Sequence, residues 1–342
     1  MRGFASDNYA PVHPEVLAEI ERVNVDHARA YGYDPVTAEL RDLFKQHFGP
    51  ATESFVVFNG TGANVVSLQL LLRPWEAVIA PSTAHINVDE GGAPEHYLGA
   101  KIIDVPTEHG KLTAADVHSV WCRVGDEHAV QPRVVSVTQS TEVGTRYSAD
   151  ELGALAEAAH SHNGFLHVDG ARISNAAAGL GLGFKDFTTD VGVDLLSFGG
   201  TKNGLLGAEA VLVLNTNIDA SHVLNIRKQA MQLSSKQRYF SAQLVALLRD
   251  DLWHRLASHS NEMAQRLAAA VSDIPGVKVT HPTQANGVFA TVPGAAIATL
   301  QEHYAFYEWD ESVHEVRWMC SWDTTTDDVD NFARLIRATV TA

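Results

Sequence analysis

A single lysine follows a short, largely apolar segment near the middle of the chain. Residues 195–198 read Leu-Leu-Ser-Phe, and Gly-Gly-Thr-Lys-Asn-Gly follows at residues 199–204. The apolar run predicts a buried strand, and the glycines predict a tight turn at its carboxyl end. Ligands bind at that edge of an open α/β sheet. Because a buried amine loses proton affinity, Lys202 is a candidate nucleophile that could form a Schiff base with an aldehyde.

An acidic residue ends another expected strand upstream of that lysine. Residues 165–168 read Phe-Leu-His-Val and lead into Asp169, Gly170, Ala171 and Arg172. The carboxyl ends of neighbouring parallel strands meet at one edge of a sheet, so Asp169 and Lys202 are expected to converge. This pair suits pyridoxal 5'-phosphate (PLP), since a carboxylate pairs with the protonated pyridine nitrogen while a lysine holds the aldehyde as an imine.

A glycine-rich turn precedes a helical pattern after an earlier strand. Residues 54–58 predict the strand, residues 59–64 read Asn-Gly-Thr-Gly-Ala-Asn, and residues 65–72 predict the helix. Small residues at a helix start allow backbone N–H groups to face a phosphate. The stretch lacks the lysine of a Walker loop and the third glycine of the dinucleotide fingerprint. A simple strand-to-helix turn stays open as the alternative for this stretch taken alone.

Composition limits the classes of function. The chain has 342 residues and a formal net charge of −16, which argues against general nucleic-acid binding. No apolar run approaches the roughly 18 residues that a membrane span needs, so no membrane partner is expected. Cys122 and Cys320 lie far apart, which predicts two free thiols in a reducing cytoplasm. The 17 histidines show no metal-ligand spacing, so no metal site is expected.

The order of predicted elements indicates an α/β fold. Strands alternate with helices to about residue 215, which favours a mostly parallel central sheet with helices on both faces. Long helical patterns follow, and short strands with further helices then predict a smaller C-terminal α+β domain. We therefore expect an N-terminal segment and a large cofactor-binding domain in residues 1–245, and a small domain in residues 246–342.

Seven motifs resemble those of the L-threonine aldolases and occur in the same order as in that family. The low-specificity and phenylserine-type bacterial branch is the most similar. The resemblance covers almost the whole chain and implies the PLP-dependent transferase fold type I. The motifs are Ser-Asp-Asn at 6–8, Tyr-Gly-Tyr-Asp at 31–34, Asn-Gly-Thr-Gly-Ala-Asn at 59–64, Ala-His at 84–85, His-Val-Asp-Gly-Ala-Arg at 167–172, the segment around Lys202, and Val-Arg-Trp-Met-Cys-Ser-Trp-Asp at 316–323.

The resemblance implies a role in cofactor binding for several of these positions. Lys202 would carry the Schiff base, Asp169 would face the pyridine nitrogen, and His85 would stack on the ring. Arg172 is also expected near the cofactor. The phosphate would lie at the turn formed by Gly60, Thr61 and Gly62.

The resemblance also implies how an amino-acid substrate is held. Ser6, Arg172 and Arg317 would bind its carboxylate, for which a bidentate guanidinium is suited. His85 and His128 are both candidates for taking the β-hydroxyl proton, because a neutral imidazole titrates near pH 7. The choice between them stays open.

Active sites shared between chains are a further implication of the resemblance. In a homodimer or homotetramer, a neighbouring chain would contribute Tyr31 and the basic stretch that contains Arg227 and Lys228, with Lys236 or Arg238. The alternative for the basic stretch is a solvated helix face.

The activity implied is that of a PLP-dependent lyase. Retro-aldol cleavage of the Cα–Cβ bond would convert L-threonine, L-allo-threonine and related β-hydroxy-α-amino acids such as phenylserine into glycine and an aldehyde. One alternative is other PLP chemistry on the same scaffold, either β-elimination or transamination. A non-catalytic α/β protein that binds a small anion is the alternative of another class.

Overall fold

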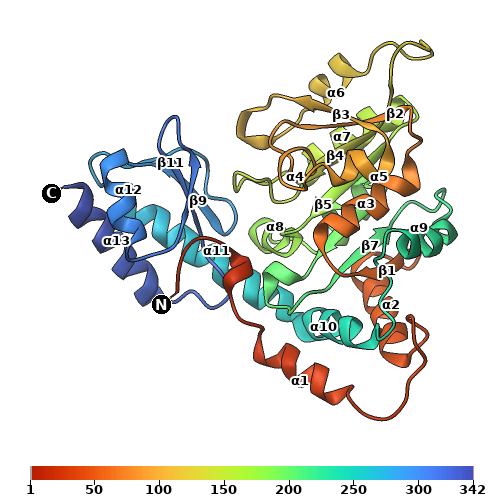
Figure 1. The fold of residues 1–342 in the computed structure, drawn as a ribbon, viewed down its shortest axis with the longest axis horizontal. Helices are drawn as coiled ribbons and strands as arrows, with labels where there is room; N and C mark the ends of the chain where they lie inside the picture. Colours follow the sequence, from red (N-terminus) through yellow and green to blue (C-terminus); the bar gives the residue numbers. More distant parts are fainter. Residues whose placement is uncertain (1, 342) are drawn as a thin grey trace.

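The computed structural model describes residues 2–341 and contains two separate β-sheets (Figure 1). The larger sheet has seven strands in the order β1-β7-β6-β5-β4-β2-β3. All run parallel except β7, which is antiparallel to both β1 and β6. The strands are β1 Glu53–Val57, β2 Glu76–Pro81, β3 Lys101–Val105, β4 Gln131–Thr138, β5 Phe165–Gly170, β6 Leu195–Gly199 and β7 Glu209–Val213. The mostly parallel central sheet expected from the sequence is confirmed.

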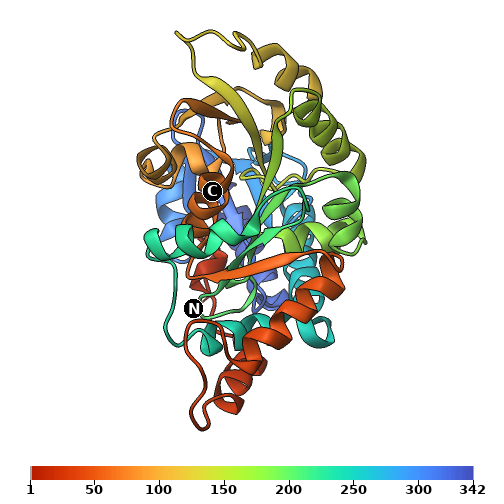
Figure 2. The same ribbon diagram turned by 90° about the vertical axis from the view of Figure 1, so that its right-hand side faces the viewer.

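Helices cover both faces of this sheet, as Figure 2 shows from the side. Successive side chains of a strand point to opposite faces, so Leu195 belongs to one hydrophobic core and Leu196 to the other. The core that contains Leu196 includes α2 Pro35–Phe48, α7 Ala149–Ser161, α8 Ile173–Leu180 and α10 Arg238–Leu248. The core that contains Leu195 includes α3 Gly60–Leu71, α5 Ala93–Leu98 and α9 Val223–Gln229. The expected helical layers are confirmed.

A smaller antiparallel sheet forms the second part of the molecule. Its strand order is β10-β11-β9-β8, with β8 Lys278–Val279, β9 Gly287–Thr291, β10 Tyr307–Asp310 and β11 Glu315–Met319. Figure 1 shows the long helix α11 Leu252–Val271 running from the large part toward this sheet, beside α12 Gly294–Gln301 and α13 Thr326–Val340. The smaller C-terminal α+β part is therefore confirmed. The expected boundary between residues 245 and 246 falls within α10.

The N-terminal segment joins the two parts. Phe4 is buried in the core of the smaller part, where its ring stacks on Phe332 with 4.5 Å between the ring centroids. The short 3-10 helix η1 Asp7–Tyr9 follows, and α1 Pro14–Arg22 packs against α10. Figure 1 shows this segment crossing from the small sheet to the large part. Residues between Phe4 and α1 are thereby placed at the junction of the two parts.

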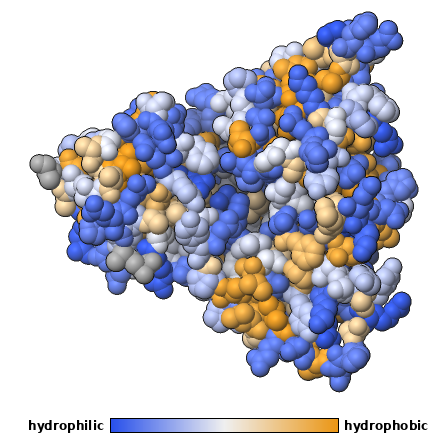
Figure 3. All heavy atoms as spheres, in the orientation of Figure 1, coloured by the Kyte–Doolittle hydropathy of each residue, from blue (hydrophilic) through white to orange (hydrophobic). Residues whose placement is uncertain are grey.

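The remaining helices are short, and polar groups dominate the surface. These helices are α4 His85–Val88 and α6 Ala114–Val120. Polar residues cover much of the face in Figure 3, and apolar areas lie below its centre and at its upper right. Within residues 2–341 there is no helix whose length and apolar character would allow it to cross a bilayer. Cys122 is exposed and Cys320 is buried, and both are free thiols, as expected.

Candidate active site

The carboxyl ends of four neighbouring strands bring the candidate residues together. Lys202 follows β6, Asp169 lies on β5, Glu142 follows β4 and His85 follows β2. This edge of the sheet is where an open α/β fold binds ligands. A cavity of about 390 Å³ opens there, and its lining includes Gly60, Thr61, His85, Asp169 and Lys202.

The turn after β6 places the Lys202 amine inside this cavity. A Cβ atom on Gly199 would lie 2.6 Å from the backbone of Ala171, so only glycine allows the two loops to approach so closely. Burial, with Arg172 nearby, lowers the pKa of Lys202 below its ordinary value. Among residues 2–341 no carboxylate forms a salt bridge with this amine. Lys202 thus has the properties of a nucleophilic lysine.

Glu209 on β7 fixes the same turn through hydrogen bonds to its backbone. Its Oε2 accepts a hydrogen bond from the Gly200 N–H at 2.8 Å, and its Oε1 accepts one from the Thr201 N–H at 3.3 Å. Burial raises the pKa of Glu209 to about 7. These contacts hold the residues that precede Lys202 in a defined conformation.

A chain of hydrogen bonds connects Asp169 with His85. Asn64 Nδ2 donates to Asp169 Oδ2 at 2.8 Å and to Glu90 Oε1 at 2.9 Å. The same Glu90 oxygen lies 2.9 Å from His85 Nδ1. This hydrogen bond raises the pKa of His85 above its ordinary value. The network fixes the Asp169 carboxylate and orients the imidazole ring beside it.

The N-terminus of α3 forms the other wall of the cavity. Asn59 caps the helix, with its Oδ1 accepting a hydrogen bond from the Gly62 N–H at 2.7 Å. A Cβ atom on Gly60 would meet nothing within 4 Å, so open space lies in front of the helix. Gly62 is covered by the side chain of Gln232, and its N–H is used by the Asn59 cap. A helix N-terminus that faces open space is suited to a phosphate group.

Together these groups fit PLP at three points. The helix N-terminus suits the phosphate, the Lys202 amine suits the aldehyde, and the fixed carboxylate of Asp169 suits a protonated pyridine nitrogen. The amine and the carboxylate line one cavity, together with the residues at the start of α3. The donor set therefore agrees with the cofactor expected from the sequence.

A second cavity, of about 420 Å³, adjoins the first and shares Lys202 and His85 with it. The small sheet and the N-terminal segment supply much of its lining. Ser6 lies there with its Oγ accepting a hydrogen bond from the Asn8 N–H at 3.2 Å. The other lining residues are Asn8, Asp89, Glu142, Arg172, Tyr307, Glu308, Trp309 and Arg317.

The two arginines of this second cavity differ in what they already bind. Arg172 donates from Nε to Asp7 Oδ2 at 2.7 Å and from Nη2 to Asp7 Oδ1 at 3.0 Å. Burial disfavours its charge, but Asp7 outweighs burial and raises the pKa of Arg172. One edge of its guanidinium is therefore occupied, which the sequence did not indicate.

Arg317 retains unused hydrogen-bonding capacity. Its Nε is buried and has no hydrogen-bond partner within residues 2–341. The guanidinium lies against the rings of Tyr307 and Trp309, with Cζ 5.2 and 5.0 Å from their centroids. Burial lowers its pKa to about 10. A guanidinium that lies over two aromatic rings and keeps one unsatisfied N–H suits a substrate carboxylate.

His128 does not line either cavity of its own chain. It lies on an exposed turn, where its N–H donates to Asp126 Oδ1 at 2.9 Å. The turn precedes β4, at the amino end of that strand, whereas the site lies at the carboxyl ends. The role that the resemblance implies for His128 therefore stays a prediction.

Tyr31 and Lys228 also lie outside both cavities, on the surface of the chain. Tyr31 is 48% exposed, and Lys228 Nζ lies 5.8 Å from the centroid of its ring. The prediction that these residues complete the site of a neighbouring chain stays a prediction.

Sequence reasoning missed several residues that line the second cavity, namely Glu142 and the β10 residues Tyr307, Glu308 and Trp309. Glu142 is the one that follows a strand of the large sheet. Its Oε1 accepts hydrogen bonds from Thr138 Oγ1 at 2.5 Å and from the His85 N–H at 3.0 Å. The available signal was its position four residues after β4, next to the strand that carries Asp169. Among residues 2–341, no three His, Cys, Asp or Glu side chains gather to hold a metal ion.

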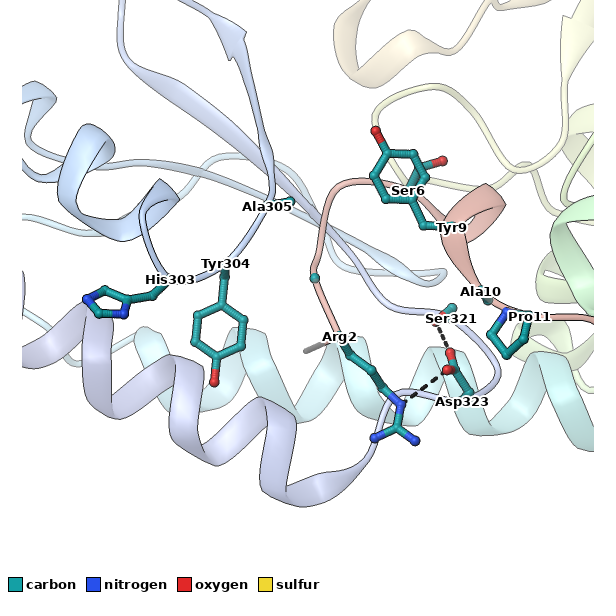
Figure 4. A pocket seen from close by; sticks show the side chains of 11 residues that line it. Arg2, Ser6, Tyr9, Ala10, Pro11, His303, Tyr304, Ala305, Ser321 and Asp323 are labelled. Carbon is teal, nitrogen blue, oxygen red and sulfur yellow. Dashed lines mark hydrogen bonds and ion pairs between the residues drawn. The ribbon is translucent and has the colours of Figure 1, made fainter.

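A third cavity, of about 350 Å³, lies beside the N-terminal segment (Figure 4). Arg2 donates to Asp323 Oδ2 at 3.1 Å, and Ser321 donates to Asp323 Oδ1 at 2.6 Å. Ser6 lines this cavity as well as the second cavity, of about 420 Å³, which is called the substrate-side cavity below. The N-terminal segment therefore forms a wall between the two. Lys202 and Asp169 do not line the third cavity, and its arginine is already paired.

Comparisons with known proteins agree with this geometry. A sequence model of the β-eliminating lyase family matches residues 3–293. The chain is 44% identical to a low specificity L-threonine aldolase of Pseudomonas aeruginosa, over 98% of this chain and 96% of that protein. It is 43% identical to one from a Pseudomonas species, over 99% and 98%. The solved threonine aldolase of Leishmania major superposes with a TM-score of 0.93 at 30% identity, covering 99% of this chain and 100% of the other. The chain therefore belongs to the β-eliminating lyase family and, within it, to the threonine aldolases.

Proposed function

We propose that this protein is a PLP-dependent L-threonine aldolase. It cleaves L-threonine, L-allo-threonine and related β-hydroxy-α-amino acids such as phenylserine into glycine and an aldehyde. The observation that carries the proposal is the pair of adjoining cavities that share Lys202. One cavity offers the groups that suit PLP, and the other offers the guanidinium of Arg317 for a carboxylate, with Nη2 donating to the Ala5 carbonyl and Nε without a partner among residues 2–341.

Different residues of the chain bind different parts of the cofactor. Lys202 holds the aldehyde carbon, Asp169 holds the pyridine nitrogen in its protonated form, and the start of α3 at Gly60 and Thr61 holds the phosphate. When bound, PLP supplies an electron sink for the pair of electrons released at Cα. His85, fixed by Glu90, lies beside Asp169 in the same cavity.

Other residues orient the substrate. Arg317 and Ser6 bind the carboxylate, and Arg172 adds positive charge while its outer edge is held by Asp7. Fixing the carboxylate sets the rotation of the substrate about its bond to the amine, and therefore which bond of Cα is broken. The Lys202 amine, whose pKa is lowered by burial, can hold or release a proton at Cα.

The direct test is aldehyde release by the purified holoenzyme. L-threonine and L-allo-threonine should each yield acetaldehyde and glycine in equal amounts. Lys202→Ala should abolish the visible absorbance of the cofactor imine together with the lyase activity. Unchanged turnover in Lys202→Ala would overturn the assignment of this lysine.

The same assay separates the alternatives. A β-eliminating enzyme would release pyruvate and ammonia from L-serine, and an aminotransferase would convert its cofactor into the amine form without release of an aldehyde. A non-catalytic anion-binding protein would be colourless and inactive with all these amino acids.

We further propose that the chain assembles into a homodimer or homotetramer in which neighbouring chains complete each site. The support is the position of Tyr31 and Lys228, which lie together on the surface and away from the cavity of their own chain. The mass of the holoenzyme in solution, measured by light scattering, tests this. A monomeric active enzyme would contradict it.

A further inference from the structure

Glu142 lines the cavity proposed for the substrate, but it has no role in the function proposed above. It follows β4, which lies between β2 and β5 in the sheet, so it lies between His85, which follows β2, and Asp169, which lies on β5. Its side chain lines the substrate-side cavity, together with Lys202, Arg172 and Arg317. A carboxyl group is therefore present beside the position of the substrate.

The two oxygens of this carboxyl group are in different states. Oε1 is held by the Thr138 hydroxyl at 2.5 Å and by the His85 N–H at 3.0 Å. Oε2 is buried and has no hydrogen-bond partner within residues 2–341. A buried polar atom without a partner is costly and needs an explanation, of which a catalytic role is one. Oε2 is thus the oxygen whose acceptor positions are unused, and the side chain that carries it lines the substrate-side cavity.

The surroundings of Glu142 make it a stronger base than an ordinary carboxylate. Burial raises the pKa of Glu142, and the negative charge of Asp169 adds to the effect, against the hydrogen bonds from Thr138 and His85. The charged or titratable groups that share its surroundings are His85, Asp89, Asp169, Arg172, Lys202, Glu308 and Arg317. A carboxyl group poised closer to neutral pH is suited to accept and return a proton.

The other candidate bases of this cavity are less suited. His85 has its Nδ1 bound to Glu90, and this hydrogen bond raises the pKa of His85. Asp89 is exposed to solvent. The hydroxyl of Tyr307 is bound to the hydroxyl of Tyr9 at 3.0 Å.

We propose that Glu142 is the catalytic base that takes the proton of the substrate β-hydroxyl group. As the O–H bond breaks, Oε2 gains the proton, the carbon–oxygen bond becomes a carbonyl, and the Cα–Cβ bond breaks with its electron pair left on Cα. A proton is then added at Cα, so that the products are an aldehyde and glycine and no oxidant or reductant is needed. This inference rests on the proposed function, because only a β-hydroxy substrate offers this proton.

The test is Glu142→Gln in the holoenzyme with L-threonine. An amide oxygen can still accept hydrogen bonds from Thr138 and His85, so the loop stays in place, but it cannot take the proton. We expect kcat to fall about 100-fold or more, with KM changed by less than about threefold. The acidic limb of the pH profile of kcat/KM should be lost in this variant and restored, at a lower rate, in Glu142→Asp.

A second readout separates proton transfer at the hydroxyl from damage to the cofactor site. Glycine has no β-hydroxyl group, so exchange of its α-proton in deuterated water, and its dissociation constant from the absorbance change on binding, should both stay within about threefold of the unaltered enzyme in Glu142→Gln. Glu302→Gln, an exposed substitution of the same chemistry on the small part, serves as the matched control and should change none of these quantities.

Three outcomes are informative. Full aldolase activity of Glu142→Gln, with an unchanged acidic limb, would overturn the role of Glu142 while the proposed function stands. An equal loss of aldol cleavage and glycine exchange would also overturn it, because Glu142 would then only support the cofactor site. An unaltered chain that cleaves no β-hydroxy amino acid would overturn the proposed function itself.

Discussion

At the scale of single residues, burial is the main cause of the pKa shifts in the site. The direction of each shift depends on whether the protonated or the deprotonated form of the group carries the charge. Burial lowers the pKa of Lys202, whose charged form is protonated, and raises the pKa of Glu142, whose charged form is deprotonated. Both shifts bring the groups closer to neutral pH, where they can exchange protons. Asp7 is the exception, because a paired guanidinium reverses the effect of its burial.

Asp7 leads to a prediction about stability. Burial alone would raise the pKa of Asp7, but Arg172 and Lys202 outweigh burial and lower it below the ordinary 3.8. Asp7→Asn removes the negative charge that Arg172 faces in a buried position, so we expect a loss of about 3 kcal/mol in the free energy of unfolding. Urea unfolding followed by tryptophan fluorescence measures this loss at neutral pH.

The pH dependence of this difference has a definite sign. The pKa of Asp7 is depressed in the folded state, so its contribution is complete above the unfolded pKa and disappears as pH falls through the folded value. The difference between Asp7→Asn and the unaltered chain should be constant from pH 7 to about pH 5 and shrink below about pH 4. Asp273→Asn, at an exposed pair with Arg337, should cost less than about 1 kcal/mol at every pH. A difference that grows on acidification would contradict the pairing.

The sequence could predict residues that come directly after apolar strands. Lys202 and Asp169 follow such runs, and the ends of parallel strands necessarily meet at one edge. The resemblance implied a role for His128, but the sequence does not show that this residue lies on an exposed turn before β4, outside both cavities of its own chain. Glu142 was missed because nothing in the sequence shows which carboxylate loses its solvent and keeps an unpaired oxygen.

At the scale of elements, the start of α3 shows how local chemistry prepares a binding site. Asn59 satisfies the Gly62 N–H with its side chain, and open space lies in front of Gly60 at the same end of the helix. The cap therefore stabilises the helix and keeps the anion site in shape.

This gives a prediction with a matched control. Asn59→Ala should lower the free energy of unfolding by about 1 kcal/mol and weaken the binding of PLP, because the first turn of α3 frays. Thr325→Ala removes the corresponding cap of α13, where the side chain accepts a hydrogen bond from the Asp328 N–H. It should cost a similar free energy and leave PLP affinity unchanged. Spectrophotometric titration of the cofactor-free protein with PLP measures the affinity, and equal affinities in the two variants would contradict the role of the α3 cap.

Elements with strong patterns were predictable, whereas weakly patterned ones were not. The buried strands of the large sheet stand out because both of their faces are covered, which requires continuous apolar runs. The strand β10 has the sequence Tyr-Glu-Trp-Asp and lies half exposed at the edge of the small sheet, so no apolar run marks it. The position of β10 nevertheless matters for the site, because this strand supplies the two rings that the Arg317 guanidinium lies over.

At the scale of the whole molecule, the substrate-side cavity is assembled from distant parts of the chain. Ser6 comes from the N-terminal segment, Lys202 from the large sheet and Arg317 from the small one. Motifs identify such residues one at a time, but their meeting depends on how the two parts pack. Phe4 fixes that arrangement, because its N–H donates to the Ala305 carbonyl and its carbonyl accepts from the Met319 N–H, both at 2.7 Å.

The last prediction concerns this anchor. Phe4→Ala leaves a cavity against Phe332 and should cost about 3–5 kcal/mol in the free energy of unfolding. Ser6 and Asp7 lie only two and three residues further on, so we also expect KM for L-threonine to rise about tenfold or more as these groups lose their positions. Leu300→Ala removes a buried side chain from the same core without touching the segment, and should cost about 2–5 kcal/mol with little change in KM. Both variants are assayed at a temperature where circular dichroism shows them folded. If KM rises equally in both, the small core acts on the site through its stability alone, and the anchoring role of Phe4 is wrong.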